Sequence, residues 1–308
     1  MANLRDIRSR IDSVENTKQV TRAMKMVATA KLRRAQERIF ETRPYAYKMA
    51  DIIAHLQRVT EPEAHRLFAE REEASGVLLI AVTADRGLAG AFNSNITRLT
   101  EDTIEERFAQ ERRNGNLHLL AVGKKGHRYF ARDDHDLVGD FQGIFDDLQF
   151  ETARDIAETA AEGYLDERWS EVHVVYNEFK NSITQNRIVE PVLPIPTERF
   201  TTPVMEEEEE DIAELDEDAN LDFIFEPDAE RILETLVPRY LNFQIWRVLL
   251  ESNAAEQGAR MVAMDNATTN AEELLEDLEL TYNRARQDAI TTEILEITSG
   301  AEALEEGR

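Results

Sequence analysis

The stretch from Val77 to Asn93 reads VLLIAVTADRGLAGAFN: an apolar run, two glycines three positions apart, and a polar segment that could open a helix. Such a pattern is typical of loops whose backbone N–H groups bind phosphate. The loop DRGLAG, however, lacks the third glycine of a dinucleotide fingerprint and the Lys-Ser or Lys-Thr pair of a P-loop. We therefore favour a structural interpretation, in which Gly87 and Gly90 form tight turns at the end of a strand.

Other chemistry finds little support in the residue types. GKKGHRYF, from Gly123 to Phe130, also fails both phosphate patterns, and six histidines form no HExxH or other ligand pair. The absence of cysteine excludes disulfides, zinc–thiolate sites and thiol catalysis. Carboxylates are too numerous to single out an acid and base pair. We expect no catalytic residue, no cofactor and no metal site.

The centre of the chain has the pattern of an α/β domain. Short apolar runs predict strands, and amphipathic stretches between them predict helices. The run ITQNRIVEPVLPIP carries three prolines, which suits an edge strand. The predicted strands are Val77–Thr83, Leu117–Val122 and Val172–Asn177, and the predicted helices are about Asn95–Arg112, Lys124–Ala131 and Phe145–Tyr164.

A long helix is predicted at the start of the chain. Between Leu4 and Val59 there is no glycine and only one proline, Pro44, so the segment forms one helix of ~80 Å or two helices joined at that proline. Its heptad seam is apolar at both ends and polar in the middle, at Lys18, Thr21 and Lys25.

This first helix is basic in an otherwise acidic chain. Residues 1–40 carry a net charge of +6, whereas the whole chain of 308 residues carries −26. An anionic partner is expected: nucleic acid, an anionic membrane surface or an acidic protein surface. Bases and apolar residues are interleaved along the same stretch, unlike the separate basic block and zipper of DNA-binding helices, so nucleic acid is disfavoured.

A second long helix is predicted from Pro227 to about Leu304, with a kink or a restart at Pro238. Two such helices most simply form an antiparallel coiled coil beside a central Rossmann-like α/β domain. We therefore predict three segments: 1–60 as the N-terminal coiled-coil helix, 61–225 as the α/β domain, and 226–308 as the C-terminal coiled-coil helix. An acidic loop, residues 206–218, holds ten acids in thirteen positions and is interpreted as solvated surface.

The composition also bears on the cellular setting. Only seven of the 36 basic residues are Lys, against 62 acids, which suggests a halophilic source; an acidic mesophilic protein is the alternative. No run approaches the ~18 apolar residues of a membrane span, and the N-terminus lacks a signal-peptide core. A cytoplasm-like compartment is expected.

Five segments together resemble the gamma subunit of F-type ATP synthases, in the right order and over nearly the whole chain. The helix motifs at the two ends are the most specific, whereas the acidic block and the overall acidity depart from the family pattern. The segments are Ile7–Gln36, TADRGLAGAFN, Phe225–Leu241, GARMVAMDNATTNA and Tyr282–Leu304.

The resemblance implies a rotary function. In this family the terminal helices form a shaft inside a ring of alternating alpha and beta subunits, and the α/β domain sits with the epsilon subunit on the c ring. Proton flow turns the shaft, which biases the three catalytic beta subunits in turn. The resemblance thus implies a non-catalytic subunit, indirectly held at the cytoplasmic face of a bacterial plasma membrane, with no nucleic acid partner. A bacterial source is favoured because no transit peptide or chloroplast-type cysteine is present.

The resemblance also implies contact residues. Met24 and Lys25, and Arg286 with Gln287, match family positions that meet the beta subunits. Arg43 and Pro44 are expected near the c ring and the epsilon subunit. The alternative function is a nucleotide-binding α/β enzyme with a coiled-coil oligomerisation arm.

Overall fold

The computed structural model describes residues 4–60, 65–71, 76–132, 135–196, 200–207 and 228–306. The chain divides into two compact units, Met1–Val27 with Met261–Arg308 as unit 1 and residues 28–260 as unit 2. Two helices, α1 (Leu4–Val59) and α7 (Ala229–Glu306), each contribute to both units. The division of the chain into segments 1–60, 61–225 and 226–308 stays a prediction.

Unit 2 contains a five-stranded sheet in the order β3-β2-β1-β4-β5. The first four of these pair in parallel, and β5 runs antiparallel to β4. The proline-rich run predicted the edge position of β5, and this is confirmed. The three predicted strands are confirmed. The strands are β1 (Val77–Val82), β2 (Leu117–Val122), β3 (Asp136–Leu137), β4 (Glu171–Phe179) and β5 (Gln185–Leu193).

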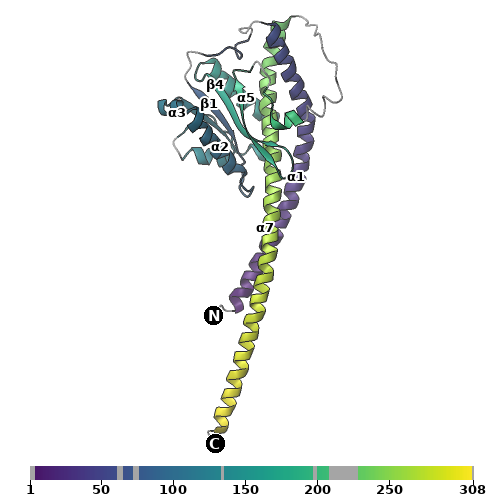
Figure 1. The fold of residues 1–308 in the computed structure, drawn as a ribbon, viewed down its shortest axis with the longest axis vertical. Helices are drawn as coiled ribbons and strands as arrows, with labels where there is room; N and C mark the ends of the chain where they lie inside the picture. Colours follow the sequence, from purple (N-terminus) through teal and green to yellow (C-terminus); the bar gives the residue numbers. More distant parts are fainter. Residues whose placement is uncertain are drawn as a thin grey trace. The chain divides into compact units, whose positions relative to one another are not determined.

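Helices cover both faces of this sheet (Figure 1). Alternate residues of β1 point to opposite faces, and Leu79 lies in a buried cluster with Ile96 of α2 (Phe92–Arg107) and Phe130 of α4 (Lys124–Phe130). On the other face lie α5 (Phe150–Leu165) and part of α7. Both faces are therefore buried, which explains why the central strand β1 is apolar along its whole length.

In each unit α1 and α7 pair in opposite directions. In unit 2 the rings of Tyr45 and Phe243 lie 4.6 Å apart, and Arg43 pairs with Glu251. In unit 1 Lys25 pairs with Asp265. A step forward along α1 thus meets a step backward along α7, which confirms the predicted antiparallel arrangement.

Neither proline interrupts its helix. Pro44 lies inside α1, which is a single helix, and Pro238 lies inside α7. Of the kink or restart predicted at Pro238, the restart is wrong, because α7 continues through this proline, and the kink stays a prediction. Leu233, Val237 and Leu241 are fully buried or nearly so on both sides of that proline, and their burial offsets the ~3 kcal/mol cost of an interior proline.

Three local predictions need correction. The helix predicted at Asn95–Arg112 is split at Phe108, which leaves the helical conformation and is buried, so α3 (Ala109–Asn114) follows α2. The helix predicted from Phe145 begins only at Phe150, after a 3-10 turn at Ile144–Asp146. Strand β3 was not predicted. Of the acidic loop 206–218, only Glu206 and Glu207 lie within the described residues.

Candidate functional site

A carboxylate of the loop after β1, that of Asp85, binds the backbone N–H groups around this loop. Asp85 Oδ1 accepts hydrogen bonds from the backbone N–H groups of Lys124 (3.0 Å) and Gly143 (2.7 Å), and its Oδ2 accepts one from Phe145 (3.0 Å). Lys124 is the first residue of α4, where the helix dipole favours an anion. The carboxylate of Asp85 therefore takes the place in which a phosphate would bind.

The glycines near this loop serve close packing. A Cβ on Gly123 would lie 2.2 Å from the carbonyl oxygen of Thr83, and one on Gly126 would lie 2.7 Å from the hydroxyl of Thr83. That hydroxyl accepts a hydrogen bond from the Gly126 N–H at 2.8 Å. The sequence GKKG thus brings α4 against the end of β1, which supports the structural interpretation over a nucleotide site.

A cluster of buried charges joins α1, α7 and the sheet within unit 2. Arg43 donates from Nε to Glu251 Oε1 at 2.8 Å and from Nη2 to Glu251 Oε2 at 3.0 Å, and the two side chains are 5% and 2% exposed. The same Nη2 donates to the carbonyl oxygen of Phe179, at the end of β4, at 3.0 Å. The Phe179 N–H in turn donates to Glu251 Oε2 at 3.0 Å.

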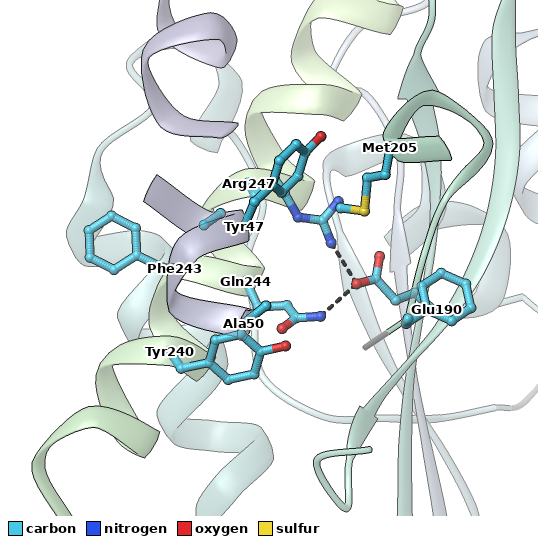
Figure 2. A pocket seen from close by; sticks show the side chains of 10 residues that line it. Tyr47, Ala50, Glu190, Met205, Tyr240, Phe243, Gln244 and Arg247 are labelled. Carbon is cyan, nitrogen blue, oxygen red and sulfur yellow. Dashed lines mark hydrogen bonds and ion pairs between the residues drawn. The ribbon is translucent and has the colours of Figure 1, made fainter. Parts of the chain in front are cut away.

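A second buried pair lies one turn earlier on α7 (Figure 2). Arg247 donates to Glu190 Oε1 at 2.5 Å and to the Tyr176 hydroxyl at 3.0 Å, while Tyr176 donates to Glu190 Oε2 at 2.8 Å. Gln244 donates to Glu190 Oε1 at 2.6 Å. Burial raises the pKa of Tyr176 well above its usual value. For Arg247 burial alone would lower the pKa, but Glu190 and Tyr176 raise it well above the usual range, so the guanidinium stays charged.

These buried groups border a cavity of about 20 Å³. Tyr47, Met205 and Phe243 also line it (Figure 2). Its volume is about that of a single water. The charged groups at this place therefore bind one another rather than a substrate.

The expected contact residues near the start of α1 lie in a polar part of the helix pair. Met24 and Lys25 are both half-buried. Lys25 Nζ lies 2.5 Å from Asp265 Oδ1. One turn earlier, the hydroxyls of Thr21 and Thr268 lie 2.8 Å apart. The polar middle of the predicted seam is therefore matched by polar residues of α7.

The end of α7 is exposed. Arg286 and Gln287 are exposed, and within unit 1 α7 continues beyond the first residues of α1 (Figure 1). Several large apolar side chains of this stretch also face away from the rest of the chain. They are Leu280, Ile290, Ile294, Leu295 and Ile297.

Comparison with known proteins identifies the family. A family model described as ATP synthase matches residues 3–304. The ATP synthase gamma chain of Salinibacter ruber is 62% identical over 306 residues, covering 99% of each chain. The gamma chain of Chloroherpeton thalassium is 47% identical, again covering 99% of each chain. The chain belongs to the ATP synthase gamma chain family.

Solved structures agree with this assignment. In a structure of the central stalk and c ring of the Tetrahymena thermophila mitochondrial ATP synthase, the matching chain is 25% identical, with a TM-score of 0.54, covering 80% of this chain and 99% of that one. In the Euglena gracilis mitochondrial ATP synthase the matching chain has a TM-score of 0.65 at 20% identity, covering 99% and 95%. The second likeness concerns the fold alone.

Within this gamma chain fold, the two residues expected near the c ring differ in exposure. Pro44 is exposed, whereas Arg43 is buried and its guanidinium binds Glu251 and Phe179. Sequence analysis did not single out Glu190, Arg247 or Glu251. A signal was present, since Gln244, Arg247 and Glu251 recur at helical spacing within a largely apolar segment, LNFQIWRVLLES.

Two kinds of site are not found in the described part of this gamma chain family member. Among the described residues, no group of three His, Cys, Asp or Glu side chains could hold a metal ion. No helix in the described ranges combines the length and hydropathy needed to span a membrane.

Proposed function

We propose that this chain is the central rotary stalk subunit of a bacterial F-type ATP synthase. It would couple proton flow through a c ring to ATP synthesis at the beta subunits, without a catalytic site of its own. Its partners would be the alpha and beta subunits, the epsilon subunit and the c ring. It would be held indirectly at the cytoplasmic face of the plasma membrane.

The observation that carries this proposal is the exposed end of α7. Ile294 and Ile297 are 57% and 68% exposed on a helix that continues beyond the start of α1. Exposed apolar side chains of this density mark a protein interface. A shaft enclosed by other subunits accounts for them, and a free monomeric enzyme does not.

We further propose that Met24, Lys25, Arg286 and Gln287 contact the beta subunits. Arg286 and Gln287 are exposed. Lys25 forms an ion pair with Asp265. The ion pair is itself half exposed, so it would be weak and strongly screened by salt. Contact of residues 43 and 44 with the c ring or the epsilon subunit stays a prediction, in which exposed Pro44 is the more accessible of the two.

The test is isolation of the tagged chain from its native membranes in high salt. We expect the alpha and beta subunits to co-purify, and ATP to drive rotation of a probe attached to this chain. A single cysteine can carry the probe because the chain has none. Recovery of the chain alone, with an intact synthase left in the membrane, would overturn the proposal.

Variants of the exposed apolar end make the test more specific. Ile294→Glu with Ile297→Glu should weaken retention of the alpha and beta subunits. Ile183→Glu, at a still more exposed position (76%) between β4 and β5 in unit 2, is the control. Equal loss of subunits in both variants would count against the end of α7 as the enclosed surface.

A further inference from the structure

We propose that Arg43 and Glu251 are positioning residues that fasten the helix pair to the α/β domain, so that torque passes between these elements through buried ion pairs. The inference rests on the proposed rotary function. It adds to that function the residues through which the α/β domain is attached to the helix pair. It concerns only residues of unit 2.

The first step is that one carboxylate joins three elements. Glu251 belongs to α7 and binds Arg43 of α1 through both of its oxygens. It also accepts the N–H of Phe179, whose carbonyl oxygen accepts from Arg43. The four hydrogen bonds form a closed set between α1, α7 and the end of β4, so none of the three elements can shift alone without breaking at least one.

The second step is that the neighbouring turn of α7 repeats the arrangement. Arg247 and Gln244 bind Glu190 of β5 (Figure 2). Arg247 also binds the Tyr176 hydroxyl of β4. Positions 244, 247 and 251 lie on one face of a helix. A single face of α7 is thus bound to both strands at this edge of the sheet.

The third step concerns the direction of the load. Apolar contacts are non-directional, so a helix can slide or roll against them with little change in buried area. A bidentate Arg–carboxylate pair requires a specific geometry and resists movement across its axis. Torque between a domain and a shaft acts in that sideways direction, which favours ion pairs as the elements that bear it.

The fourth step concerns salt. Exposed pairs such as Lys25–Asp265 are weakened by the high ionic strength that the acidic composition suggests. Arg43 and Glu251 are almost completely buried, so salt screens their attraction much less. The attraction between Arg43 and Glu251 would therefore persist at salt concentrations that weaken ion pairs at the surface.

The test uses the whole synthase in membrane vesicles, with Arg43→Met and Glu251→Leu combined in this chain. Replacing both members of a buried pair by apolar residues of similar volume is often neutral for stability, whereas removing one member leaves an unpaired charge. The double variant leaves no unpaired charge, although Phe179 loses its hydrogen bonds to both side chains. Torque transmission is therefore measured only in complexes that have assembled. Subunit composition on gels shows that the complex has assembled.

The measured quantity is the number of protons pumped per ATP hydrolysed, followed as the proton gradient builds. We expect ATP hydrolysis to continue while the protons pumped per ATP fall by about two-fold or more. The fall should grow as the opposing gradient rises, because slippage increases with load. A purely structural role would reduce the number of assembled complexes and leave this ratio unchanged.

Two further variants complete the design. Arg154→Met with Glu158→Leu removes an exposed pair on α5 and should leave the ratio at the wild-type value. Arg43→Lys keeps the charge but loses the fork that binds both Glu251 oxygens and Phe179, and it should lower the ratio to a smaller extent. If the double variant does not assemble, the number of protons pumped per ATP by the Arg43→Lys complex tests the inference.

An unchanged ratio under load in the variants that assemble would overturn the inference. Failure of the proposed function is a different result, since the wild-type complex would then lack this chain or would not rotate.

Discussion

The hydroxyls of Thr21 and Thr268 lie 2.8 Å apart, although 247 positions separate them in the chain. Each hydroxyl also lies within hydrogen-bond distance of a carbonyl oxygen of its own helix, Thr21 with Lys18 at 3.0 Å and Thr268 with Met264 at 2.7 Å. This pair lies in the polar part of the seam between α1 and α7. Because a polar pair matches only in one alignment, it specifies how the two helices are staggered.

We expect Thr21→Val to lower the free energy of unfolding by about 1 kcal/mol, because the hydroxyl of Thr268 loses its hydrogen bond to the other helix. Thr17→Val is the control, since the Thr17 hydroxyl is exposed and bonds only to the carbonyl oxygen of Ser13 in its own helix. Chemical unfolding of both variants provides the comparison. Equal effects would show that the contact between helices contributes nothing.

Removing the carboxylate of Asp85 should open the loop around α4. Asp85→Ala leaves three backbone N–H groups without their acceptor, and we expect a loss of about 3 kcal/mol in stability. Hydrogen exchange at Gly143 and Phe145 should become faster. Asp147→Ala is the control, because exposed Asp147 accepts only from Gln149. Unchanged exchange at the two amides would contradict the assigned role of Asp85.

Two glycines within helices should respond to alanine in opposite ways. A Cβ on Gly163 would lie 2.0 Å from Cζ2 of buried Trp169, so Gly163→Ala should cost about 2 kcal/mol or more. A Cβ on Gly300 meets no atom within 4 Å, so Gly300→Ala should stabilise α7 by up to about 1 kcal/mol. Thermal unfolding of the two variants tests this. A stabilising Gly163→Ala would show that the Trp169 site can adapt.

His173 should make the chain less stable in mild acid. Burial lowers the pKa of this imidazole below 6.5, with Arg107 acting in the same direction and Glu171 opposing it. The Nδ1 atom has no hydrogen-bond partner among the described residues, and Nε2 lies 2.8 Å from Glu171 Oε2, so the neutral ring carries its proton on Nε2. As the pH falls through 6.5, the unfolded chain takes up a proton before the folded chain does.

The stability that His173 contributes is therefore complete above pH 6.5 and is lost toward its lower folded pKa. His173→Phe should remove this part of the pH dependence. The difference in unfolding free energy between wild type and variant, measured from pH 7 to pH 5, is the test. A difference that does not change with pH would mean that the ring titrates alike in both states.

Salt should stabilise the chain. A net charge of −26 produces repulsion that is screened over ~3 Å in 1 M salt but over ~30 Å in 0.01 M salt. We expect the unfolding temperature to fall steeply when the chain is transferred to low salt, and sucrose should not replace NaCl. Full stability in low salt would reject the halophilic hypothesis and favour the acidic mesophilic alternative.

The regular elements could be predicted because each depends on a local pattern. Val77–Val82 and Leu117–Val122 are apolar runs of strand length, and α1 has no glycine and one proline in 56 residues. Strand β3 could not be predicted, because Asp136 and Leu137 carry no strand pattern and become a strand only by pairing with His118 and Leu119. The break at Phe108 likewise depends on a buried site that the sheet provides.

The candidate residues divide in the same way. Residue types and their spacing were sufficient to predict the family, the two long helices and the lack of a phosphate-binding fingerprint. The fold was needed to show that Asp85 accepts hydrogen bonds from nearby backbone amides and that Arg43 is buried against Glu251, 208 positions away. A charged residue looks alike in sequence whether it is exposed or buried. What makes its burial tolerable is a partner brought to it by the fold.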